Sequence, residues 1–301
     1  MENNIQTSDQ YEEIDLRELF SVLWAGKVKI IAITAVFAVA SVLHALSVPN
    51  QYEATVILAP AKQESGGLSD ALGQLGGLAS LAGVRVGGGS GEGQVALEIM
   101  KSWSFIEGFI EENGLAVGLS AVEGWDIESN ELTINHNVYD VESNSWLVQK
   151  PTSWALFNSF SSRVSIRPHG NSGLLSISIE HYSPHVAKEW LDLYVVAINK
   201  HMQARQVAKV TNNIEYLEAQ IEKTSITQMQ EVFYTIIEDQ IKSQMLAKAS
   251  PEYAFTAVSP SMVPVEKSQP KRATISIFGT LSGGILSILL VLVMHYARKS
   301  D

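Results

Sequence analysis

The sequence contains no cysteine and has no excess of positive charge. The lack of cysteine fits an oxidising and a reducing compartment equally well, so it assigns no location. The formal net charge is −11, and the middle of the chain, residues 49–272, carries 16 lysine and arginine residues against 25 acidic residues. Because such a surface repels the phosphate backbone, we expect no nucleic-acid partner.

The familiar catalytic motifs are also missing. Neither Ser90 nor Ser172 lies in a Gly-x-Ser-x-Gly elbow, and the glycine-rich tract lacks the Gly-Lys-Ser/Thr ending of a phosphate loop. His181 and His185 are four residues apart, but Pro184 begins a new element between them. We interpret them as two surface histidines at a strand-to-helix junction. The chain is therefore expected not to be an enzyme, and we predict no metal site and no cofactor.

The sequence does contain long apolar segments. Hydrophobic residues make up 46% of the chain and the mean hydropathy is +0.09, above an ordinary soluble domain. Ile30–Val48 and Ala273–Met294 are free of charge, and each can span a hydrocarbon core of about 30 Å. The first follows nearly thirty mostly polar residues, so we interpret it as a retained anchor and not as a cleaved signal peptide.

Basic residues predict the orientation of these two spans. They lie on the terminal side of each span, at Lys27, Lys29, Arg298 and Lys299. This places both termini in the cytoplasm and the middle of the chain on the far side. A second basic group, residues 267–272, argues mildly the other way, but the charge rule is weak beside a long translocated domain. The expected segments are 1–29 (cytoplasmic), 30–48 (span), 49–272 (central domain), 273–294 (span) and 295–301 (cytoplasmic tail).

The segment before the first span predicts an amphipathic helix. Asp15 and Glu18 form a variant capping box, and an apolar face follows at Leu16, Leu19, Phe20, Leu23 and Trp24. This helix either lies on the membrane surface or extends the first span into the cytoplasm.

Residues 49–183 predict a mixed α/β base. Alternation and turn residues indicate strands at Tyr52–Leu58, Arg163–Arg167 and Leu175–Tyr182, and helices within Val95–Asn113 and at Ser153–Phe160. Residues 115–150 are expected to be mostly irregular. The glycine-rich tract Gly66–Gly93 is either a mobile apolar loop or a flexible linker with a weak helix.

Residues 184–250 predict a helical hairpin that projects from this base. Ser183 is an N-cap followed by proline, and the narrow seam that follows needs a partner helix. The seam, which we also predict to be a subunit contact, consists of Val207, Val210, Ile214, Leu217 and Ile221. A proline-rich segment at 251–272 then returns to the membrane, with Pro260, Pro264 and Pro270 near the second span.

The second span contains a Gly-x-x-x-Gly pattern. Gly279 and Gly283, extended by Gly284, would let another helix approach closely. The alternative is a lipid-facing helix with incidental small residues.

Together these pieces resemble the Wzz-type polysaccharide co-polymerases, the chain-length determinants of O-antigen and related surface polysaccharides. The matching pieces are the lead Glu13–Trp24, the strand Tyr52–Leu58, the helix start Ser183–Trp190, Pro251–Phe255, and Val263–Ala273 before a glycine-rich span. Their order and separation carry the resemblance.

The resemblance implies an α+β membrane protein of the inner membrane, with two transmembrane helices flanking a periplasmic base and a helical hairpin. It implies a ring-shaped homo-oligomer that acts with the polysaccharide polymerase and sets the length of the polysaccharide without forming a glycosidic bond. The growing polysaccharide and membrane lipid are further candidate partners. Because only seven residues follow Met294, we expect no tyrosine kinase domain of the kind that capsule-type relatives attach there. The alternative is a capsule or exopolysaccharide export component working with a separate tyrosine kinase. A two-span sensor would need a cytoplasmic output domain, and a membrane-tethered hydrolase is the remaining alternative.

Overall fold

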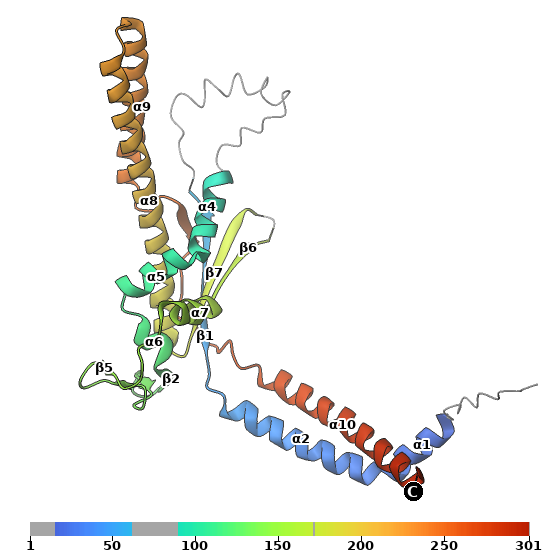
Figure 1. Ribbon diagram of the computed structural model, residues 1–301. Coiled ribbons are helices and arrows are strands. Elements are labelled where there is room, and N and C mark those ends of the chain that lie inside the picture. The colour runs from blue at the N-terminus through green and yellow to red at the C-terminus, as the bar shows by residue number, and fades with distance from the viewer. Residues whose placement is uncertain (1–15, 62–89, 171, 301) are drawn as a thin grey trace, which may run out of the picture. The chain divides into compact units, whose positions relative to one another are not determined.

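The structure, a computed structural model, describes residues 16–61, 90–170 and 172–300 (Figure 1). The chain forms two compact units: Met1–Pro49 together with Gln269–Asp301, and Asn50–Ser268. We call them the helical unit and the central unit. Residues 66–89 of the glycine-rich tract and the capping residue Asp15 lie outside the described residues, and residues 90–93 of the tract belong to a helix.

The helical unit contains α1 (Leu16–Ala25), α2 (Lys27–Ser47) and α10 (Arg272–Ser300). Helices α2 and α10 pack along each other, and both are long and apolar enough to cross a membrane, over Lys27–Ser47 and Arg272–Ala297. The prediction of two apolar helices near the ends of the chain is confirmed. Gly26 separates α1 from α2, although its N–H still donates to the carbonyl of Val22 at 2.9 Å.

A four-stranded antiparallel sheet forms the middle of the central unit. Its strand order is β6 (Val164–His169), β7 (Leu174–His181), β1 (Tyr52–Pro60) and β8 (Phe255–Ser259). The register of β1 on β7 pairs Tyr52 with His181 and Leu58 with Leu175. In β1 every second residue from Tyr52 to Leu58 is buried, which is the period expected of a strand with one covered face.

Four short helices accompany this sheet: α4 (Ser90–Lys101), α5 (Trp103–Glu112), α6 (Ala116–Ser120) and α7 (Ser153–Arg163). Gly114 follows α5 with a φ of +63°, the left-handed conformation that ends a helix.

The prediction of irregular structure for residues 115–150 is wrong in part. The structure has α6 there and two small antiparallel ribbons, β2 (Val122–Trp125) with β3 (Leu132–Ile134), and β4 (Tyr139–Asp140) with β5 (Ser145–Trp146). Strands of two to four residues are too short to show a period of two, so they cannot be predicted from the alternation of apolar and polar residues.

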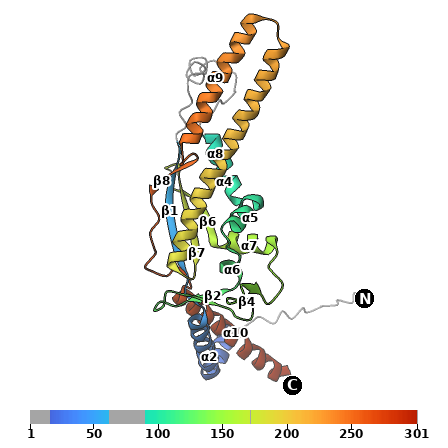
Figure 2. The same ribbon diagram turned by 90° about the vertical axis from the view of Figure 1, so that its left-hand side faces the viewer.

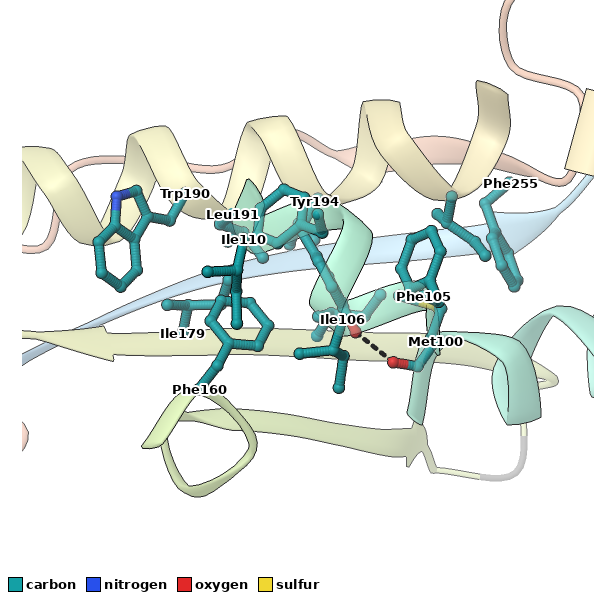
Figure 3. Close-up of a cluster of buried hydrophobic side chains, with 14 of the residues drawn as sticks. Met100, Phe105, Ile106, Ile110, Phe160, Ile179, Trp190, Leu191, Tyr194 and Phe255 are labelled. Carbon is teal, nitrogen blue, oxygen red and sulfur yellow. Dashed lines mark hydrogen bonds between the residues drawn. The ribbon is translucent and has the colours of Figure 1, made fainter. Parts of the chain in front are cut away.

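The core lies between the sheet and the first half of α8 (Pro184–Lys223), as Figure 3 shows. On α8 the buried face has helical spacing and consists of Ala187, Leu191, Tyr194, Ile198 and Met202. The hydroxyl of Tyr194 donates to the carbonyl of Met100 in α4, so the large ring is buried without leaving its polar atom unpaired. Burial raises the pKa of this hydroxyl.

The second half of α8 leaves the sheet and pairs with α9 (Thr227–Ala249) in a long antiparallel hairpin (Figure 2). At its start, Ser183 caps α8 with its side chain, which accepts from the N–H of Val186. Residues 224–226 form the turn at the far end. The central unit is thus a mixed α/β base with a projecting helical pair.

Candidate functional site

Gly279 and Gly283 lie where α10 crosses α2. A Cβ atom added at Gly279 would come closer than 3.0 Å to Cβ of Ser41, and one added at Gly283 would come equally close to Cβ of Phe37. These two glycines therefore bring the helices together at a separation that no other residue permits. Gly284 differs, because a Cβ there would meet only Oγ1 of Thr34, at 3.9 Å.

Polar contacts lie on either side of this glycine crossing. Oγ1 of Thr34 and Oγ of Ser287 are 3.3 Å apart, and Ser287 is fully buried. On the other side of the crossing, Nε of Arg272 donates to the carbonyl of Ala45 at 3.1 Å. Hydrogen bonds of this kind fix the register of two apolar helices, since apolar packing alone has little preference along the axis.

The five seam residues lie on the part of α8 that runs beside α9. Val210 is buried, and Val207, Ile214, Leu217 and Ile221 are half-buried. Two glutamine side chains of α9 also connect the arms of the hairpin. Nε2 of Gln244 donates to Oγ1 of Thr211 on α8 at 2.8 Å, and Nε2 of Gln230 donates to the carbonyl of Thr224 in the turn at 2.8 Å. The seam is used within one chain, and its role as a subunit contact stays a prediction.

Asn199 joins the hairpin to the sheet. Its side chain is buried in α8, donates to the carbonyl of Phe255 at 3.0 Å, and accepts from the backbone N–H groups of Ala254 and Phe255, both at 2.8 Å. One turn further along, Nε2 of Gln203 donates to the carbonyls of Ala247 and Ser250 at 2.9 and 3.0 Å. Two amide side chains thus hold the end of α9 and the start of β8 against α8.

The interpretation of His181 as a surface residue is wrong. Its exposed fraction is 0%, whereas His185 is exposed. His181 lies at the end of β7 under the ring of Trp190, with ring centroids 4.7 Å apart. Its Nδ1 accepts from the N–H of Ser183 at 3.1 Å. Burial, reinforced by the positive charge of Arg163, lowers the pKa of His181 to about 4, so the side chain is neutral at pH 7.

The proline-rich segment runs along the base with several anchoring contacts. Between Pro260 and Pro264, Oγ of Ser261 donates to the carboxylate of Asp192 on α8. Further on, the N–H of Ser268 donates to the carbonyl of Gln51 at 2.8 Å. Because Gln51 and Ser268 lie next to the two boundaries of the central unit, this hydrogen bond joins the segments by which the chain enters and leaves that unit. Pro270 follows a cis peptide bond and is buried.

Comparison with known proteins adds the decisive observation. Residues 12–113 match the family model Wzz, the chain length determinant protein. The resemblance predicted from the sequence is confirmed over these residues, which are about a third of the chain and include α1, α2, β1, α4 and α5. No curated protein matches the chain.

Two solved structures of polysaccharide co-polymerases are similar to this chain at low identity. A full-length bacterial polysaccharide co-polymerase is 15% identical, with 95% of this chain and 99% of that chain covered and a TM-score of 0.39. A fragment of WzzB, a polysaccharide co-polymerase from Salmonella Typhimurium, is 12% identical, with 73% of this chain and 100% of that chain covered and a TM-score of 0.32.

Proposed function

We propose that this chain regulates the length of a surface polysaccharide, as a homo-oligomeric co-polymerase of the bacterial inner membrane. The match of residues 12–113 to the Wzz model carries this proposal. The two apolar helices and the mixed α/β unit between them support it, because that order of elements suits a protein anchored twice in one membrane. The polysaccharide is O-antigen, and the membrane partner is its polymerase.

The first test is deletion of the gene, followed by electrophoresis of the extracted lipopolysaccharide. We expect the modal cluster of chain lengths to be lost while polymerisation continues, since the chain regulates the polymer and does not form its bonds. An unchanged ladder would contradict the proposal. A change confined to capsule or exopolysaccharide would instead support the alternative, an export component with a separate tyrosine kinase.

The proposal places both termini in the cytoplasm and the central unit in the periplasm. Because the chain has no cysteine, single-cysteine variants can test this directly. Ser225→Cys lies in the exposed turn of the hairpin, and Lys299→Cys lies in the tail. In intact cells with a permeable outer membrane, a membrane-impermeant maleimide should label the first variant and not the second. The reverse pattern would refute the orientation.

The close helix crossing at Gly279 and Gly283 suggests that the helical unit acts as a rigid anchor. We expect Gly279→Leu and Gly283→Leu to force α2 and α10 apart, because the added atoms would overlap Ser41 and Phe37. Each variant should shift or abolish the modal length at unchanged expression. Gly284→Ala is the matched control, since a methyl group there meets nothing closer than 3.9 Å.

Oligomer formation is tested on the full-length protein in nanodiscs or mild detergent. Electron microscopy should show closed rings, as the proposed homo-oligomer requires. Uniform monomers under these conditions would contradict the proposed homo-oligomer. The regulation of chain length is tested separately, by the gene deletion.

A further inference from the structure

Helix α1 packs against a part of α10 that lies inside the candidate span of α10. Val22 on α1 and Val291 on α10 are both buried. Val291 lies six residues before Ala297, where the candidate span ends, and six residues of helix are about 9 Å long. The contact therefore holds the second half of α1 at a level within the apolar part of the helical unit.

Gly26 makes this contact possible. A Cβ atom added at Gly26 would lie 2.5 Å from Cγ1 of Val291, so only glycine lets the junction of α1 and α2 come so close to α10. Figure 1 shows that α1 leaves the line of α2 at this junction. A straight extension of α2 would carry Phe20 about 10 Å beyond Lys27, whereas the bend keeps α1 beside α10.

Two aromatic rings of α1 are left uncovered by this packing. Phe20 is 67% exposed and Trp24 is 63% exposed. They lie one helical turn apart and stack on each other, with ring centroids 6.2 Å apart. Nζ of Lys27 lies 4.5 Å from the centroid of the Trp24 ring. The uncovered surface of α1 is thus an aromatic pair, Phe20 and Trp24, with an ammonium group at one end.

The boundary between lipid headgroups and acyl chains has the matching chemistry. Tryptophan is enriched at this depth of a membrane because its ring is apolar and its N–H is polar. Lysine extends its apolar stem along the same layer and brings its ammonium group to the phosphates. An apolar stripe on a short helix beside the start of a span is also the arrangement by which a helix lies in the interface.

A protein partner fits the same surface less well. A helix of another protein that covered the aromatic pair would also cover the ammonium group of Lys27, and a buried charge without a partner is costly. A second copy that docked by the same surface would bring its own Lys27 to this one, and the two like charges would repel each other. Lipid phosphates would instead neutralise the charge.

We propose that α1 is an interfacial helix, and that Phe20 and Trp24 lie side by side among the headgroups and upper acyl chains of the leaflet in which α2 begins. This inference rests on the proposed function, which places the helical unit in a membrane. The aromatic pair fixes the depth of the helical unit, because neither ring can move into water or into the middle of the bilayer without losing its matched surroundings.

The test moves one tryptophan along α1 and measures its depth. Trp24 is the one of the six tryptophans that lies outside the central unit, so the variant Trp24→Phe shows the emission of the other five. The full-length protein is placed in nanodiscs of phosphatidylcholine, either plain or brominated on the upper part of the acyl chains, because bromine quenches a nearby indole. A double variant, Phe20→Trp with Trp24→Phe, exchanges the two rings and keeps the aromatic pair.

We expect brominated lipid to quench the tryptophan at position 24 and the tryptophan at position 20 to the same extent. In a straight extension of α2, residue 20 would lie about 6 Å further from the bilayer than residue 24 and would lose clearly less emission. Two controls in the Trp24→Phe background set the range. Val36→Trp, at a site in α2 that is also 67% exposed, should be quenched by lipid, and Ser225→Trp in the hairpin turn should not.

Each other outcome overturns the inference. Quenching at position 24 without quenching at position 20 would show that α1 extends into water. If lipid quenches neither position and aqueous iodide quenches both, the aromatic pair faces water. If neither agent quenches either position, a second copy of the chain covers the pair. Failure of the proposed function is seen separately, as an unchanged ladder after gene deletion.

Discussion

The buried histidine at the end of β7 makes the stability of the central unit depend on pH. His181 has a pKa of about 4 in the folded protein and an ordinary value of 6.5 when exposed. Below pH 6.5 the unfolded chain binds a proton that the folded chain excludes. The free energy of unfolding therefore falls as the pH falls, from about pH 6.5 down to about pH 4.

The size of the effect follows from these two values. Between pH 7 and pH 5 the difference in proton binding removes about 2 kcal/mol from the free energy of unfolding. For a domain of 150–250 residues, about 1 kcal/mol corresponds to 2–4 °C in melting temperature. We therefore expect His181 alone to lower the melting temperature by about 4–8 °C over this range.

The assay is thermal unfolding of the full-length protein in nanodiscs, followed by intrinsic fluorescence at pH 7 and pH 5. His181→Asn removes the titrating ring but keeps an oxygen that can accept from the N–H of Ser183. This variant should be less stable at pH 7, because it leaves a void beside Trp190, and should lose less stability on acidification. His169→Asn is the control, since His169 is exposed on β6. Parallel losses in wild type and His181→Asn would refute the reasoning.

Two further substitutions test the packing of the base in the same unfolding assay. Asn199→Leu should lower the free energy of unfolding by about 3 kcal/mol, because it leaves three backbone groups without their side-chain partner. The control is Asn212→Leu, which changes an exposed asparagine of the same helix and should alter the free energy of unfolding little. Equal effects of the two substitutions would contradict the role of the buried amide. Gly118→Ala should destabilise by about 1–3 kcal/mol, because the new Cβ would lie 2.7 Å from the ring of Trp190. Gly108→Ala has no atom within 4 Å of its new Cβ and should be neutral or stabilising, since alanine is the better helix former.

Features with a local signal could be predicted from the sequence. Charge-free length predicts α2 and α10, because a helix that crosses a membrane needs about 20 mostly apolar residues in a row. Serine followed by proline predicts the start of α8, and Gly114 predicts the end of α5. The glycine pattern of α10 indicates where a helix can approach, while the identity of that helix as α2 needed the structure.

Features made by distant residues could not be predicted. Asn199 appears in the sequence as one polar residue in an apolar stripe, and its partner Phe255 is 56 residues away. His181 did have a signal: it continues the alternation of Ile177 and Ile179, which are also buried. The helix start at Ser183 and Pro184, two residues later, favoured the interpretation that His181 lies at an exposed junction.

The two amides at the base of the hairpin allow the length of the hairpin to vary without a change in the rest of the fold. Asn199 and Gln203 bind the helical pair to the base at the level where it leaves the sheet. The contacts of the core therefore do not depend on the length of the two helices beyond this level. Lengthening both arms by one heptad would carry the turn about 10 Å further out and leave the base unaltered. Evolution, or a protein engineer, could thus change the reach of this protein in steps without redesigning the part that folds.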